Sequence, residues 1–241
     1  MRRFWPPATE RSMPERGTVL FDLDGTLVDS APDLADALDV LLVERGHAPA
    51  GLHNTRRLIG HGISDLVCKA LTEKGEVMEA LALATAVQRF LAHYTPNLSR
   101  RSLPYPHTVQ TLGDLAASGW RLVVCTNKLE SSARRLLFDH GLLAFFDLVA
   151  GPDTFGVAKP DPQHLLRCLP AGGRAIMVGD SEPDIMAAKA ARIPVIAVAW
   201  GYAKRPLADL APDAIAHSMR DIPALAAKID AESLKPDRTS P

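Results

Sequence analysis

Apolar and polar positions follow three different rhythms along this chain. Residues 18–23 (TVLFDL) form a short, almost continuous apolar run that ends at a cluster of Asp, Gly and Thr. An apolar run of this length, bounded by turn residues, is typical of a buried β-strand followed by a loop. The first element that the pattern predicts is therefore a buried strand.

Residues 30–99 show only helical patterns. Apolar residues recur three and four positions apart over 34–42, 63–71 and 77–91. This spacing places them on one face of an α-helix, and the glycines that follow the first two runs are common helix ends. Three or four helices without a strand predict a small helical bundle that stands apart from any sheet.

The remaining sequence alternates strand and helix patterns. The strand candidates are residues 122–125, 148–150, 175–178 and 194–199. Alternation of this kind predicts an α/β fold, with a Rossmann-like parallel sheet covered by helices on both faces.

The three rhythms also suggest boundaries along the chain. We expect an N-terminal extension over residues 1–16, a helical domain over 30–99 and a C-terminal tail over 233–241. The α/β domain takes residues 17–29 and 100–232, so the helical domain is an insertion into it.

Composition narrows the class of protein. The chain has 241 residues, 47% of them apolar and 23% charged, with a formal net charge of -1. A nucleic-acid-binding face needs a basic excess, and a membrane span needs about 20 consecutive apolar residues, so neither partner is expected. Three widely spaced cysteines predict neither a disulfide framework nor a zinc site, and we expect a cytoplasmic protein.

The most informative segment is FDLDGTLVDS, residues 21–30. Asp22 and Asp24 stand two positions apart where the predicted strand ends. One of two such carboxylates can attack phosphorus while the other transfers protons, once a divalent cation neutralises the approach of two anions. An Asp-Gly turn is the structural alternative, but D-x-D-G-T directly after an apolar strand is much rarer than a turn.

Two later segments carry groups that suit a phosphoryl group. Thr126 and Asn127 follow a predicted strand, and a threonine hydroxyl and a backbone amide can both donate to phosphoryl oxygens. Lys159, in VAKPDP, offers a compact cation. Each has an ordinary alternative, namely a helix cap for the Thr-Asn pair and a solvated surface position for the lysine.

A fourth segment, VGDSEPDIMAA, places Asp180 at the end of a predicted strand and Asp184 one helical turn later. Carboxylate oxygens are the ligands that Mg²⁺ prefers. Helix capping explains Asp184 almost as well, but it explains Asp180 poorly. Because ligands of parallel sheets bind beyond the carboxyl ends of the strands, we expect these four segments to meet in one crevice.

The order of these motifs resembles the haloacid dehalogenase superfamily of phosphotransferases, in which a helical cap domain often follows the first motif. The resemblance implies that Asp22 is the nucleophile and Asp24 the acid and base. It implies a Mg²⁺ ion held by Asp22, the backbone carbonyl of Asp24 and Asp180, with Asp184 in support. Phosphoryl oxygens would be held by Thr126, Asn127 and Lys159.

Within the superfamily the chain is most similar to the phosphoglycolate phosphatases. The similarity lies in CTNK (125–128), IGHGI (59–63), KPDP (159–162) and WGY (200–202). It implies a monomer or homodimer that hydrolyses a small phosphorylated metabolite, with 2-phosphoglycolate as the leading candidate. YPHTV stands where such enzymes commonly have Y-P-G-V, which bears on the choice of substrate.

Selection of the substrate is expected from the turn between two helices of the cap. Arg56, His61 and Gly62 are the residues we assign to it, with His61 favoured over the arginine. A loop whose arginines face water is an equally good interpretation.

Two other functions remain open. A phosphosugar phosphatase or mutase of the same superfamily would share every core motif. A non-catalytic protein with this fold could use the crevice to bind a ligand, although it would have little need for a proton-transferring Asp24.

Overall fold

A six-stranded sheet runs through the centre of the computed structural model, which describes residues 16–233. The strands are β1 (Thr18–Phe21), β4 (Arg121–Cys125), β5 (Leu148–Ala150), β6 (Ala175–Gly179), β7 (Val195–Val198) and β8 (Ala214–Ala216). Their order is β5-β4-β1-β6-β7-β8, and every neighbouring pair is parallel. The predicted α/β fold with a parallel sheet is confirmed.

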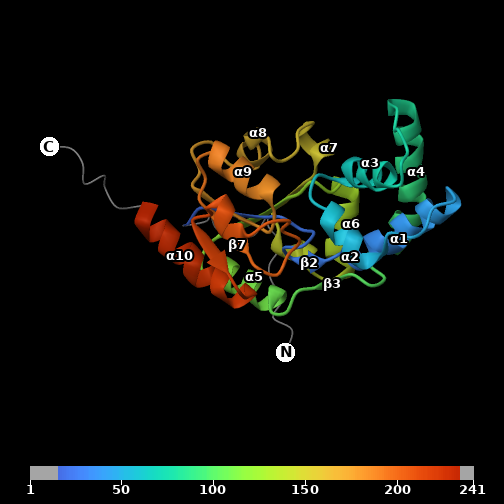
Figure 1. Ribbon diagram of the computed structural model, residues 1–241. Helices are drawn as coiled ribbons and strands as arrows, with labels where there is room; N and C mark the ends of the chain where they lie inside the picture. The colour runs from blue at the N-terminus through green and yellow to red at the C-terminus, as the bar shows by residue number, and fades with distance from the viewer. Residues whose placement is uncertain (1–15, 234–241) are drawn as a thin grey trace.

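Alternate residues of each strand pack against helices on opposite faces of this sheet. Val19 and Leu122 belong to a core shared with α5 (Thr108–Ala117), α6 (Glu130–Asp139) and α10 (Ile222–Ser233). Leu20 and Val123 pack on the other face, where α8 (Pro162–Leu166) and α9 (Glu182–Ala190) lie. Figure 1 shows α5 and α10 on one side of the sheet and α8 and α9 on the other. Both faces are covered, so the strands are apolar throughout.

A group of four helices, which we call the helical insertion (residues 31–97), lies beside the sheet (Figure 1). The helices are α1 (Ala31–Glu44), α2 (Gly51–Leu58), α3 (Ile63–Glu73) and α4 (Ala80–Asn97). Their apolar stripes bury Leu38, Leu71 and Phe90 against one another. A two-stranded antiparallel ribbon, β2 (Val28–Asp29) with β3 (Leu103–Pro104), joins the entry and exit of this insertion.

Four shorter elements complete the described chain. They are α7 (Pro152–Phe155) and the 3₁₀ turns Leu143–Phe145, Leu207–Leu210 and Met219–Asp221. Among residues 16–233, no helix is long and apolar enough to cross a bilayer. The predicted N-terminal extension (1–16) and C-terminal tail (233–241) lie outside the described residues, except for one residue of each.

Three local details differ from the sequence-based expectation. Helix α4 continues past Pro96, which is tolerated because a proline so close to the end of a helix disrupts only its last turn. Arg56 belongs to the last turn of α2 rather than to the following turn. Strand β8 was not expected, because its three residues are too few to show a period.

Candidate active site

Three neighbouring strands of the sheet end at one edge, and each delivers a polar residue there. Asp22 follows β1, Thr126 follows β4 and Asp180 follows β6. The registers pair Phe21 with both Val124 and Val178, so the three strand ends lie level. The sequence-based expectation that these distant segments meet in one crevice is therefore confirmed.

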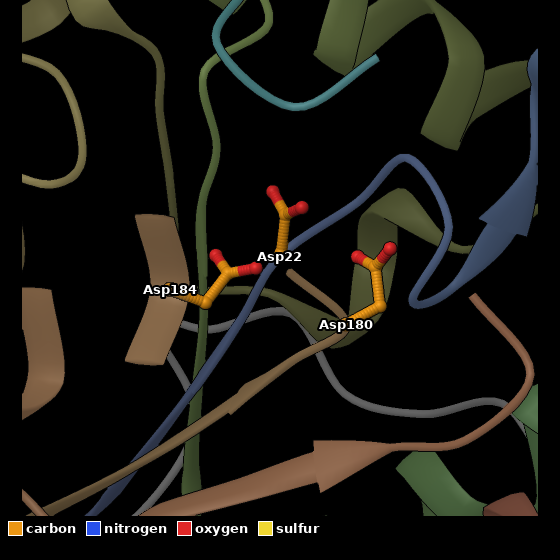
Figure 2. Close-up of side chains that lie close together, drawn as sticks. All are labelled: Asp22, Asp180 and Asp184. Atoms are coloured by element: carbon orange, nitrogen blue, oxygen red, sulfur yellow. The ribbon is translucent and has the colours of Figure 1, made fainter. Parts of the chain in front are cut away.

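Three buried carboxylates come together at this edge (Figure 2). Asp22, Asp180 and Asp184 each offer an oxygen, and the three oxygens lie within 4.8 Å of one another. Asp184 comes from the first turn of α9, where its Oδ2 accepts hydrogen bonds from the backbone N–H (3.1 Å) and the hydroxyl (2.7 Å) of Ser181. Asp184 thus caps the helix and reaches the carboxylate cluster at the same time.

Asp180 is held by three contacts with other loops. Its Oδ1 accepts from the hydroxyl of Thr26 at 3.0 Å, and its Oδ2 accepts from the backbone N–H of Tyr202 at 2.7 Å. Gly25 has φ +87°, and a Cβ there would stand 2.6 Å from Asp180 Oδ2. The Asp-Gly-Thr sequence is therefore required by the close approach of its backbone to Asp180 as well as by its turn.

Two of these carboxyl groups, Asp22 and Asp180, have a raised pKa. Burial raises the pKa of Asp22 to about 6; Lys159 opposes this rise, while the carboxylates of Asp184 and Asp24 add to it. Burial, Asp184 and Asp22 together raise the pKa of Asp180 well above its ordinary value. Burial is the main cause of both shifts, and repulsion from the neighbouring carboxylates adds to it.

Lys159 is the cation nearest to this cluster. Its Nζ lies 2.9 Å from Asp22 Oδ1 and donates to Asp184 Oδ1 at 2.6 Å and to the carbonyl of Cys125 at 2.7 Å. Burial alone would lower the pKa of Lys159, but attraction to Asp184 and Asp22 outweighs it and raises the pKa. The lysine is buried, so the alternative of a solvated surface position is wrong.

Asn127 fixes the backbone of Lys159. Its Oδ1 accepts from the Lys159 N–H, and its Nδ2 donates to the Lys159 carbonyl, both at 2.9 Å. The same Nδ2 donates to the carbonyl of Gly60, in the turn between α2 and α3, at 3.1 Å. The Asn127 side chain thus links the sheet edge to the helical insertion, and none of these three bonds uses the backbone N–H of Asn127.

A second lysine, Lys128, pairs with Asp24 of the first motif. Lys128 Nζ donates to both carboxylate oxygens of Asp24, at 3.0 and 3.1 Å, and to the hydroxyl of Tyr94 on α4 at 2.6 Å. The Ser30 hydroxyl also donates to Asp24 Oδ1. Sequence reasoning did not assign a role to Lys128, although its place directly after Thr126 and Asn127 put it in the same loop.

These side chains line a cavity of about 450 Å³ between the sheet edge and the helical insertion. The sheet side contributes polar groups, namely Asp22, Asp24, Thr126, Asn127 and Lys128. The insertion contributes Leu34, Ile59, Gly60, Gly62, Ile63 and Leu66. The cavity is therefore polar on one side and largely apolar on the other.

The three residues expected to select the substrate lie in different surroundings. Gly62 lines this cavity. Arg56 instead donates to Asp29 Oδ2 at 2.7 Å. His61 lines a second cavity of about 320 Å³, together with Glu182 and Lys204 among others. Only one of the three therefore lies on the wall that faces Asp22.

The carboxylate cluster fits a hard divalent cation. It combines three buried carboxylates, and the buried Asp22 Oδ1 accepts no well-directed hydrogen bond among the described residues, despite its ion pair with Lys159. Oxygen donors of this charge and spacing are typical of Mg²⁺ sites. The residues present thus suit the ion that the sequence predicts.

Comparison with known proteins agrees with this geometry. The sequence model of the haloacid dehalogenase-like hydrolases matches residues 19–198. A phosphoglycolate phosphatase of Rhodospirillum rubrum is 44% identical over 200 residues, covering 80% of this chain and 83% of its own. One of Caulobacter vibrioides is 38% identical over 210 residues, covering 86% and 89%.

A solved structure extends the likeness to three dimensions. The crystal structure of a predicted phosphoglycolate phosphatase from Haemophilus somnus superposes with a TM-score of 0.81 at 30% identity, covering 89% of this chain and all of that one. Sequence and overall fold thus agree with these relatives, and the chain belongs to the haloacid dehalogenase-like hydrolases.

Proposed function

We propose that this protein is a Mg²⁺-dependent phosphoric monoester hydrolase that converts 2-phosphoglycolate to glycolate and phosphate. The observation that carries the proposal is the convergence of Asp22, Asp180 and Asp184, together with the cavity that Asp22 and Asp24 line. The relatives named above, whose names state this activity, support it.

Mg²⁺ would be held by Asp22, Asp180 and the backbone carbonyl of Asp24, with Asp184 in support. When bound, the ion would offset the repulsion between the Asp22 carboxylate and the phosphate. Lys159, 2.9 Å from Asp22 Oδ1, contributes positive charge at the same point.

The first step transfers the phosphoryl group to Asp22. A carboxylate oxygen of Asp22 forms a bond to phosphorus as the bond from phosphorus to the ester oxygen breaks. Asp24 gives a proton to the departing ester oxygen, which leaves as the hydroxyl of glycolate. Thr126, whose hydroxyl lines the cavity, and the backbone N–H of Asn127 hold the phosphoryl oxygens meanwhile.

The second step restores the enzyme. Asp24, now ionised, accepts a proton from a water molecule as the water oxygen bonds to phosphorus. The bond between phosphorus and Asp22 breaks, and phosphate departs. The helical insertion covers the cavity from the other side, and we propose that residues 30–99 act as a cap domain that excludes bulk water during these steps.

A screen of phosphomonoesters tests this function. The purified protein with Mg²⁺ is expected to release phosphate from 2-phosphoglycolate with a higher kcat/KM than from sugar phosphates of three to six carbons. Steady release of inorganic phosphate would exclude a mutase, which returns the phosphoryl group to a sugar. Absence of phosphate release from every ester in the panel would favour the non-catalytic ligand-binding protein.

A further inference from the structure

Lys128 is the cation on the wall of the cavity that holds Asp22 and Asp24. The other described side chains of that wall are acidic, neutral or apolar. Arg56 is paired with Asp29, and His61 lies in the second cavity. A negatively charged group on the leaving part of a substrate therefore has one side-chain cation within the cavity to pair with.

We propose that Lys128 is a specificity-determining residue that binds a second anionic group on the substrate, a carboxylate close to the phosphate ester. This inference rests on the proposed phosphatase function and names the feature of the substrate that the site selects.

Contacts with two side chains hold the Lys128 ammonium in place. Its Nζ donates to Asp24 and to the Tyr94 hydroxyl, and it lies 4.8 Å from the centre of the Tyr94 ring. The side chain is 2% exposed. A buried ammonium held from the sheet side and from α4 is oriented before the substrate arrives, so little side-chain entropy is lost on binding.

The contact with Asp24 sets the distance between the two anionic groups of the substrate. In the proposed reaction Asp24 is hydrogen-bonded to the ester oxygen, and Lys128 Nζ lies 3.0 Å from the Asp24 carboxylate. Three hydrogen bonds in series, from the ester oxygen to Asp24, from Lys128 to Asp24 and from Lys128 to the carboxylate, span at most about 9 Å. A carboxylate attached to the carbon that bears the ester oxygen lies well within this reach.

The opposite wall favours the same kind of molecule. Leu34, Ile59, Ile63 and Leu66 offer only carbon atoms from their side chains. Hydroxyl groups of a phosphosugar would lose water there without gaining partners, which is unfavourable. A short, unhydroxylated carbon chain with one terminal carboxylate meets both walls without this loss.

Two esters of equal size separate the charge from the shape of the substrate. 2-Phosphoglycolate carries the carboxylate, and its primary amide, 2-phosphoglycolamide, is neutral at that end. The wild-type protein is expected to prefer the carboxylate by about 10- to 100-fold in kcat/KM, the range of a charge-assisted hydrogen bond. In Lys128→Met the ratio is expected to fall close to one.

The ratio of the two kcat/KM values is the informative quantity, because effects common to both esters cancel in it. Loss of the ammonium changes the surroundings of Asp24 for both esters alike, and an inactive fraction of the preparation lowers both rates alike. Lys204→Met is the matched control, since Lys204 lines the second cavity, and it is expected to keep the wild-type ratio.

Each outcome decides between the two proposals. A preference for the carboxylate that persists in Lys128→Met overturns the role of Lys128 and leaves the phosphatase function standing. A preference that is lost in Lys204→Met would place the carboxylate-binding site in the second cavity. If the wild-type protein hydrolyses neither ester, the proposed function fails and this inference with it. If Lys128→Met hydrolyses neither, dissociation constants measured by calorimetry in the Asp22→Asn background give the same ratio without turnover.

Discussion

The two walls of the cavity are built in opposite ways. On the sheet side, Asp22, Asp180 and Lys159 lie at strand ends and in loops, and ion pairs and hydrogen bonds tie them to other segments. On the insertion side, the wall consists of apolar side chains and glycines, and the hydrogen bonds from Asn127 to Gly60 and from Lys128 to Tyr94 are among the contacts that tie the insertion to the sheet edge. We therefore expect chemistry that needs fixed charges to depend on the first wall and selection of substrate shape to depend on the second.

The largest loss of activity is expected from a substitution on the sheet side. Asp22→Asn should reduce turnover of 2-phosphoglycolate at least about 1000-fold, because an amide cannot serve as the attacking group. The fold should survive, since the amide replaces a carboxylate whose ionised form burial disfavours. Steady-state phosphate release and thermal unfolding measure the two quantities.

A matched acidic residue on the helical insertion controls for loss of charge. Asp36 on α1 is about half exposed and pairs with Arg101. Asp36→Asn is expected to keep turnover within about twofold, since exposed ion pairs contribute little. Substantial activity in Asp22→Asn would show that Asp22 is not the nucleophile.

Removal of the metal should have the next largest effect. A chelator is expected to abolish phosphate release, and added Mg²⁺ should restore it, because the proposed ion offsets the repulsion between the Asp22 carboxylate and the phosphate. Titration of the metal-free protein with Mg²⁺, followed by calorimetry, checks binding independently of turnover. Activity that persists in excess chelator would contradict the metal assignment.

The same cluster gives the metal-free protein a distinctive pH dependence. Because the pKa of Asp22 is about 6 in the folded protein and 3.8 unfolded, the folded state binds more protons between these values. Unfolding free energy should therefore decrease as pH rises from about 4 to about 6, by up to about 3 kcal/mol from Asp22, and the raised pKa of Asp180 adds a loss in the same direction. Saturating Mg²⁺ at pH 7 should recover this loss. Chemical denaturation at several pH values measures it.

Much of the site on the sheet side could be predicted from sequence, because it depends on local sequence patterns. Strand periodicity and the parallel-sheet rule place Asp22, Thr126 and Asp180 at one edge without knowledge of any contact. By contrast, the pairing of Lys128 with Tyr94 depends on how α4 lies against the sheet edge, which no local pattern specifies. The assignment of His61, Gly62 and Arg56 to substrate selection, the cytoplasmic location and the choice between monomer and homodimer stay predictions.

Two glycines with nearly the same φ compare the sheet side with the helical insertion. Gly25 (φ +87°) lies on the sheet side, and Gly75 (φ +88°) lies between α3 and α4. A Cβ at Gly75 would meet no atom within 4 Å, so Gly75→Ala should cost only backbone strain, about 1 kcal/mol. A Cβ at Gly25 would collide with Asp180, so Gly25→Ala should cost about 2 kcal/mol more.

Chemical denaturation measures both glycine variants, and Mg²⁺ calorimetry separates them further. Gly25→Ala should weaken Mg²⁺ binding because it displaces a ligand, while Gly75→Ala should leave it unchanged. Equal losses of stability in the two variants would show that backbone conformation, and not the approach to Asp180, explains the glycine of the first motif.

The smallest expected effect concerns Arg56, on the insertion side. Its guanidinium donates to Asp29 Oδ2, and Asp29 Oδ1 also accepts from the Tyr202 hydroxyl at 2.6 Å. Because this pair is partly exposed, Arg56→Gln should lower the unfolding free energy by about 0.5 kcal/mol. The KM for 2-phosphoglycolate should change less than about threefold, since the guanidinium is already paired. Arg57→Gln, at an exposed neighbour on the same helix, is the control. A tenfold rise in KM confined to Arg56→Gln would mean that Arg56 leaves Asp29 to bind the substrate, and the insertion would then supply charge as well as shape.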